Sequence, residues 1–280
     1  MEELDFSKPA EKPQPVNLAA ALDFFRTSGV AENVDLGTNI FVEDEKGGLF
    51  SRKTRKMYLL LEGEVNLIAA NRLIAVVKAG EIFGEMAAIS DSPRAATAVA
   101  KTACRLIAMD DKGFSAALKA KPDFALTLLG MMINRLRGML ARVQSPASLI
   151  EAKKESRVFD KGLLAALAKG LGPTNTARYE KGRTIMTEGQ AGAMMYVVQE
   201  GRVAVSIQGR VVERVGVGGA FGEMALVDQS PRAATAMAEI DSILLTLNRA
   251  VFLQLVKTQP EFGVALLSAA AERVRFMASR

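Results

Sequence analysis

Apolar and polar positions along the chain follow one pattern twice. A helix-like apolar segment, Leu18–Phe25, precedes short strand-like runs such as Met57–Val65, where apolar residues alternate or cluster and a Glu-Gly pair interrupts them. The second half opens the same way with Leu163–Gly170 and continues with Met195–Val203. Short apolar runs bounded by glycine favour strands, whereas longer amphipathic segments favour helices. The sequence therefore predicts two similar domains of the α+β class.

The repeat also predicts the domain organisation. We expect a flexible N-terminal arm over residues 1–15, a first domain over 16–140, a helical linker over 141–158 and a second domain over 159–280. Each domain is predicted to be an antiparallel β-roll, jelly-roll-like, flanked by helices. Pro122 and Pro260 are expected where one helix ends and the next begins.

One stretch is repeated more closely than the rest. Phe83–Ala100 reads FGEMAAISDSPRAATAVA and Phe221–Ala238 reads FGEMALVDQSPRAATAMA, identical at thirteen of eighteen positions. The offset is constant at 138 (232 minus 94), and each copy has a glutamate nine residues ahead of an arginine. An ordinary turn with a surface ion pair is the simple alternative, but its recurrence in register argues against it.

The residue types of this stretch suit a nucleotide. Glycine lets the backbone approach a ligand closely, and the apolar run that follows is long enough for one helical turn, whose N–H groups suit a phosphate. Pro93 fixes the direction in which Arg94 leaves the corner. Arginine can grip two phosphate oxygens, and glutamate can accept hydrogen bonds from a ribose hydroxyl.

The two stretches resemble the phosphate-binding cassette of the cyclic nucleotide-binding domain. That family includes regulatory subunits of cAMP-dependent protein kinase, bacterial catabolite activator proteins and nucleotide-gated channels. The resemblance implies that the Gly-Glu pair meets the ribose 2′-OH, while the arginine and the following alanine amide bind the cyclic phosphate. The residues implied are Gly84, Glu85, Met86, Ala87, Arg94 and Ala95 in the first copy, and Gly222, Glu223, Met224, Ala225, Arg232 and Ala233 in the second.

The resemblance also suggests a cap for the base. In bacterial channels of this family an arginine at a similar place stacks on the purine, and nucleotide binding draws the last helix over the site as a lid. Arg135 and Arg273 each lie forty-one residues after the cassette arginine (135 minus 94; 273 minus 232). A solvated helix arginine is the alternative interpretation of both.

Composition narrows the function classes. The chain of 280 residues has no histidine, one cysteine and a net charge of +5. Without histidine, His-based acid–base chemistry and most zinc sites are excluded, so we expect neither an enzyme nor a metal site. The single cysteine, the lack of a secretory signal and the lack of a long apolar run favour a cytoplasmic protein without a membrane segment.

The expected function is therefore a non-enzymatic receptor for cAMP that acts through an unidentified effector protein. Receptors for cGMP or a cyclic dinucleotide, and a scaffold with vestigial sites, remain alternatives. In this family, cassettes selective for cGMP often place threonine directly after the arginine, where this chain has Ala95 and Ala233. We expect no DNA-binding motif, because the chain reaches Arg280 one helix after the second cassette. An Arg-Arg-X-Ser/Thr-like inhibitor segment is missing from the N-terminal arm, which leaves kinase inhibition in doubt.

A seven-residue insertion (145 minus 138) distinguishes the first repeat. It lies between Gly47 and Met57 and contains four cations beside the apolar pair Leu49 and Phe50. This combination predicts that the loop Gly48–Lys56 docks onto an acidic partner or onto the second domain. A solvated loop is the alternative.

Overall fold

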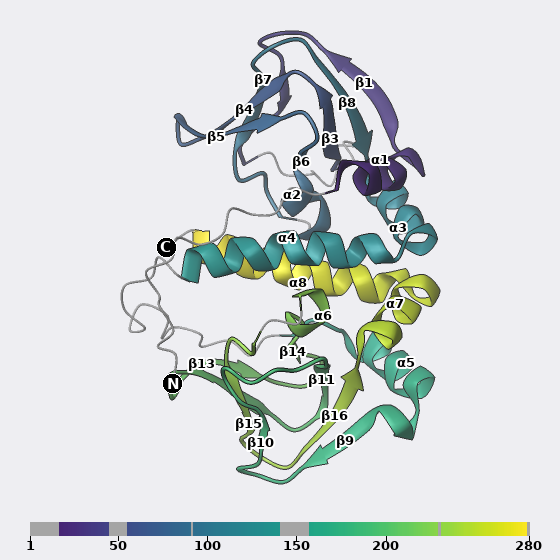
Figure 1. The fold of residues 1–280 in the computed structure, drawn as a ribbon, viewed down its shortest axis with the longest axis vertical. Coiled ribbons are helices and arrows are strands. Elements are labelled where there is room, and N and C mark those ends of the chain that lie inside the picture. Colours follow the sequence, from purple (N-terminus) through teal and green to yellow (C-terminus); the bar gives the residue numbers. More distant parts are fainter. Residues whose placement is uncertain (1–16, 45–54, 91, 141–156, 229–230, 279–280) are drawn as a thin grey trace. The chain divides into compact units, whose positions relative to one another are not determined.

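The fold was analysed in a computed structural model, which describes residues 17–44, 55–90, 92–140, 157–228 and 231–278 (Figure 1). Close packing divides it into two compact units, Met1–Met131 with Leu267–Arg280, and Met132–Leu266. Each unit contains one β-roll. The predicted arm and most of the predicted linker lie outside the described residues, and the predicted domain boundaries stay predictions.

The first β-roll consists of two four-stranded sheets in which every strand pair is antiparallel (Figure 1). One sheet has the order β1 (Val30–Val34), β8 (Cys104–Met109), β3 (Met57–Glu62), β6 (Ile82–Phe83). The other has the order β2 (Asn39–Phe41), β7 (Thr97–Ala100), β4 (Glu64–Ala69), β5 (Arg72–Lys78).

The second β-roll repeats this topology. One sheet has the order β14 (Ala220–Phe221), β11 (Met195–Glu200), β16 (Ser242–Leu247), β9 (Thr176–Tyr179). The other has the order β10 (Thr184–Met186), β15 (Thr235–Ala238), β12 (Val203–Ile207), β13 (Arg210–Val215). The predicted class, two tandem antiparallel β-rolls with helices, is confirmed.

Alternation along the strands builds the cores. In the first roll Val65 of β4 and Ala98 of β7 are fully buried and pack with Leu60 and Leu106 from the other sheet. Val203 and Val205 of β12 are buried in the core of the second roll, at 0% and 8% exposure. Because successive side chains of a strand point to opposite faces, burying these positions leaves their neighbours on the outer face.

Helices cover the open sides of each roll. They are α1 (Leu18–Arg26), α3 (Asp111–Ala120), α4 (Asp123–Leu140), α5 (Lys161–Leu171), α7 (Arg249–Thr258) and α8 (Pro260–Ala278), with the short 3₁₀ helix η2 (Pro173–Asn175). Side-chain caps define the starts of α1, α3, α5 and α7; Asp110, for example, accepts from Gly113 N at 2.8 Å. Pro122 lies between α3 and α4, and Pro260 begins α8, as predicted. None of the helices in the described ranges combines the length and apolarity that a membrane span requires.

Candidate functional site

Each cassette begins at a glycine that leaves a strand in a left-handed conformation. Gly84 follows β6 with φ +71°, and Gly222 follows β14 with φ +76°. A Cβ at Gly84 would lie 3.0 Å from Arg94 Nη1 and 3.0 Å from Phe41 Cε1, and one at Gly222 would lie 2.9 Å from Arg232 Nη1. A larger residue is excluded twice, by backbone conformation and by the adjoining arginine.

The predicted helical turn follows each glycine. It is α2 (Glu85–Ser90) in the first cassette and α6 (Ala225–Asp228) in the second. The chain then returns through the arginine into β7 or β15. Cassette glycine and cassette arginine are thereby brought side by side although ten residues separate them.

Arg94 is buried, at 6% exposure, and is held by the protein itself. Its Nη1 donates to Gly84 O at 2.7 Å, and its Nη2 donates to Lys56 O at 2.7 Å. Its guanidinium carbon lies 4.1 Å from the centroid of the Phe41 ring, within the range of a cation–π contact. Two carbonyls and one ring therefore fix the plane of this guanidinium.

Arg232 is also buried, at 8% exposure, but its surroundings differ. Its Nη1 donates to Gly222 O at 3.1 Å, and its guanidinium carbon lies 5.9 Å from the Tyr196 ring centroid. The guanidinium packs directly against Gly192, where any Cβ would overlap it. Among the described residues, Arg232 thus donates to one carbonyl where Arg94 donates to two.

The glutamates complete the two clusters. Glu85 and Glu223 are buried, at 3% and 8% exposure, and each is engaged in a polar or electrostatic interaction. Each glutamate directly follows the glycine whose carbonyl accepts from the cassette arginine, and buried charged residues of this kind are unusual outside ion pairs and binding sites. The cluster supplies an acceptor and a planar cation in one place, the pair of groups that a sugar phosphate needs.

The smaller cassette residues are placed as follows. Ala87 is buried, Met86 and Met224 are partly buried, and the alanines after the arginines, Ala95 and Ala233, are exposed. Ala225 is the first residue of α6, and its side chain lies outside the described residues. The exposed position of both alanines leaves the backbone after each arginine accessible from solvent.

The two predicted base-capping arginines lie in the long helices α4 and α8. Arg135 lies in α4, but its side chain is outside the described residues. Arg273 lies in α8, is partly buried and has an interaction partner within the protein. Their capping role stays a prediction.

Sequence reasoning missed three groups that hold the arginines. They are the Phe41 ring, the Lys56 carbonyl and Gly192. Phe41 could be found in part from the repeat, which aligns it with Met186 (186 minus 41 is 145). A phenylalanine ring at this position can make a cation–π contact with an arginine, which a methionine thioether cannot. The Lys56 carbonyl could not be identified from the sequence, because every residue has a backbone carbonyl.

A hollow of about 730 Å³ lies elsewhere in the second unit. Lys169, Arg178 and Glu200 are among the residues that line it, and no cassette residue contributes. Its charged groups belong to exposed or half-exposed side chains at the end of α5 and on β9 and β11. Among the described residues, buried side chains of opposite charge occur in both cassettes and not around this hollow.

Comparison with known proteins identifies the family of the chain. A family model described as the cyclic nucleotide-binding domain matches residues 49–121 and 176–259. The chain is 30% identical over 224 residues to the cAMP-dependent protein kinase regulatory subunit of Eremothecium gossypii, covering 80% of this chain and 43% of that protein. The corresponding protein of Debaryomyces hansenii is 29% identical over 224 residues, with 79% and 43% covered. The chain thus spans less than half the length of these curated relatives.

A solved structure of the regulatory domain of Toxoplasma gondii PKA with cAMP is also similar. It is 22% identical, covers 88% of this chain and 86% of its own, and has a TM-score of 0.31. The family assignment rests on the two matched segments, which together make up more than half of the chain and include both cassettes. The chain belongs to the cyclic nucleotide-binding domain family.

Proposed function

We propose that this protein is a non-enzymatic cytoplasmic receptor for cAMP, with one site in each cassette. The observation that carries the proposal is the duplicated cluster of buried glutamate, positive-φ glycine and buried arginine. Glu85 and Glu223 are the proposed acceptors for the ribose hydroxyl, and Arg94 and Arg232 the proposed cations for the cyclic phosphate. Because neither cassette lacks any of these residues, a scaffold with vestigial sites is the weaker interpretation.

The donor geometry supports an anionic ligand. A guanidinium has five N–H donors, and among the described residues Arg232 donates to a single carbonyl, Gly222 O. The N–H groups of Ala95 and Ala233 have no acceptor within the described part of the chain. A phosphate bound there would receive charge-assisted and neutral hydrogen bonds from adjacent residues, which is how proteins hold such groups.

Two observations favour cAMP over other cyclic nucleotides. The residues after the arginines are Ala95 and Ala233, with no hydroxyl at the position where cGMP-selective cassettes often have one. The similar curated proteins are named for cAMP. The base itself is expected to meet Arg135 or Arg273 when the terminal helix closes as a lid.

The direct test is calorimetric titration of the full chain with cAMP, cGMP and cyclic-di-GMP. A ligand of this size at about −0.3 kcal/mol per heavy atom gives roughly −7 kcal/mol, near ten micromolar. Charge-assisted bonds worth about 1.5–3 kcal/mol each lower the dissociation constant further, so we expect low micromolar or tighter cAMP binding. Stronger binding of cGMP or of the dinucleotide would identify that nucleotide as the ligand instead of cAMP. No heat of binding with any of the three nucleotides at millimolar concentration would contradict the proposal.

A relay to an effector is the second part of the proposal. In the second domain Arg249, the first residue of α7, donates from Nη1 to the carbonyl of Leu226 in α6 at 3.0 Å. The cassette helix and the C-terminal helices are thus connected by a hydrogen bond, so a shift of α6 on ligand binding would pull on α7. The effector is proposed to be a protein, with a protein kinase as the first candidate because the similar curated proteins are kinase regulatory subunits.

A further inference from the structure

The two β-rolls differ most clearly at one edge strand. β5 ends the sheet of the first roll and β13 ends the matching sheet of the second, and no strand pairs with the outer edge of either among the described residues. The registers are equivalent: Leu67 pairs with Ala75 as Val205 pairs with Glu213. The two edges can therefore be compared position by position.

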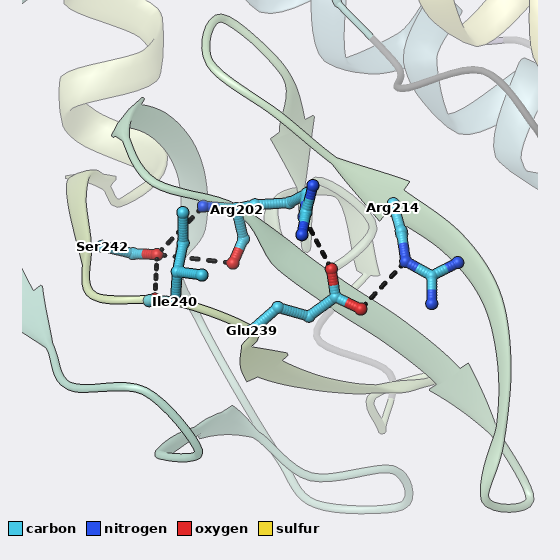
Figure 2. A network of polar contacts seen from close by, with 5 residues as sticks. All are labelled: Arg202, Arg214, Glu239, Ile240 and Ser242. Atoms are coloured by element: carbon cyan, nitrogen blue, oxygen red, sulfur yellow. Dashed lines mark hydrogen bonds and ion pairs between the residues drawn. The ribbon is translucent and has the colours of Figure 1, made fainter.

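β13 carries charges at its centre and β5 does not. Glu213 and Arg214 of β13 stand where β5 has Ala75 and Val76. Figure 2 shows Arg214 reaching from β13 to Glu239, to which its Nε donates at 2.9 Å. Charged side chains on an edge strand prevent pairing with other strands, so the second roll has a protected edge and the first has an open one.

The open edge is apolar and accessible. Between Arg72 and Lys78 the strand reads Leu-Ile-Ala-Val-Val, and Leu73 and Ile74 are 60% and 58% exposed. Two neighbouring exposed aliphatic residues on an edge strand are an aggregation hazard unless something covers them. The equivalent residues of β13 are Val211, 41% exposed, and the partly buried Val212, so the apolar exposure is larger on β5 and has no charged residue beside it at the strand centre.

The backbone of β5 points outward at defined residues. Glu64 O accepts from Lys101 N at 2.8 Å and so faces β7. Its partner on β5, Lys78, must then face the outer edge, where its N–H donates to Glu81 Oε2 at 2.7 Å. Outward pairs alternate in an antiparallel ladder, so the N–H and C=O of Val76 also face the outer edge.

The ends of the strand decide which occupant fits. Antiparallel pairing of β5 with β5 of a second copy would set Arg72 opposite Lys78 of that copy, and like charges directly opposite are destabilising. A strand with carboxylates at both ends and small apolar residues between them would instead meet opposite charges. We propose that β5 binds an extended segment of a partner protein, apolar at its centre and acidic at both ends, by adding a strand to this sheet.

The test uses the full chain and the acetylated, fluorescein-labelled peptide EVTVTVE. We expect a saturable rise in anisotropy, at least tenfold weaker binding of KVTVTVK, and no saturation with a version that has proline at its centre. The double variant A75E/V76R, which installs the charges of β13, should weaken EVTVTVE binding at least tenfold. Both replaced residues lie on the outer edge strand, and thermal unfolding of the variant reports whether it is folded.

Three results would overturn the proposal. One is equal binding of EVTVTVE and KVTVTVK, and another is unchanged binding by both A75E/V76R and the second variant, Ile74→Lys. The third is a concentration-dependent dimer, seen by sedimentation and removed by A75E/V76R, which would make a second copy the occupant. Amide exchange gives an independent reading: the Val76 amide should exchange quickly in the free chain and at least tenfold more slowly with EVTVTVE. None of these outcomes depends on nucleotide binding.

Discussion

At the scale of single residues, the two cassette arginines contribute differently to the stability of their domains. Arg94 donates to two carbonyls and lies over the Phe41 ring, whereas Arg232 donates to one carbonyl and packs against Gly192. Leaving a buried carbonyl without its donor costs about 1–3 kcal/mol, and an arginine–ring contact contributes about 0.5–2 kcal/mol. Removing Arg94 should therefore affect folding as well as binding.

We expect Arg94→Ala and Arg232→Ala each to weaken cAMP binding at its own site by about 2–5 kcal/mol, because the phosphate loses its cation. Arg94→Ala should also lower the free energy of unfolding by about 1–3 kcal/mol, and Arg232→Ala by less. Calorimetric titration and thermal unfolding measure the two effects. Arg105→Ala is the control, since Arg105 forms an exposed ion pair with Glu62 and lies outside both cassettes. Two-site binding unchanged in both cassette variants would show that the site lies elsewhere.

The cassette residues themselves were predictable from sequence, because repetition separates them from ordinary turns. The groups around Arg94 were not. Lys56 acts through its carbonyl, and Phe41 comes from a strand that lies more than fifty residues earlier (94 minus 41). Such contacts depend on how β2 and β3 pack, and residue type alone does not encode that packing.

At the scale of secondary-structure elements, the repeats keep an ion pair but reverse its charges. Glu64 and Lys101 of the first roll pair at 2.6 Å, and the equivalent residues of the second roll, Arg202 and Glu239, pair at 2.7 Å. The hydrogen bond and charge of Lys101 lower the pKa of Glu64. A carboxyl whose pKa is lowered by folding stabilises the fold above its unfolded-state pKa and loses that effect as pH falls through the folded-state pKa. The Glu64–Lys101 ion pair should therefore stabilise the fold less as the pH falls through the folded-state pKa of Glu64.

The second roll extends its pair into a network. Figure 2 shows the Glu239 carboxylate between Arg202 and Arg214, at 2.7 Å and 2.9 Å from their Nε atoms. We expect Glu239→Gln to lower the free energy of unfolding by about 1 kcal/mol, since two arginines lose one shared partner. Lys101→Gln is the matched variant in the first roll and should cost less, because it breaks a single exposed pair. Thermal unfolding compares them, and an equal or opposite order would show that the network adds nothing.

Most elements could be predicted from their patterns, and the exceptions have a physical reason. The helices after Asn17 and Asp160 and the strands beginning at Met57 and Met195 lie where apolar periodicity placed them. The first strand, β1 (Val30–Val34), was not singled out, because all of its residues are exposed or only partly buried and its sequence VAENV does not alternate. Residues 30–34 form a strand because they pair with β8, although their own sequence does not indicate a strand.

At the scale of the whole molecule, function depends on how a filled cassette is reported to a partner. The predicted docking loop, Gly48–Lys56, falls largely outside the described residues, so its role stays a prediction. Its last residue is informative: Lys56 pairs with Glu32 at 2.6 Å through its side chain and accepts from Arg94 through its carbonyl. Any shift of Arg94 toward a ligand would therefore act directly on the end of this loop.

The second domain offers a different connection, and it leads to a sharper test. Arg249 joins α7 to the cassette through Leu226 O, whereas its counterpart in the first repeat is Asp111 (249 minus 138), which cannot donate such a bond. If this bond carries the relay, Arg249→Met should leave cAMP affinity at the second site nearly unchanged while reducing the cAMP-induced change in amide exchange along α7. Loss of one such contact typically changes coupling by about 0.5–2 kcal/mol. Arg249→Lys, which can still donate, should keep part of the response, and Asp111→Asn should leave it intact. A full response of α7 in Arg249→Met would place the relay in the apolar packing between the cassette and the helices instead of in this hydrogen bond.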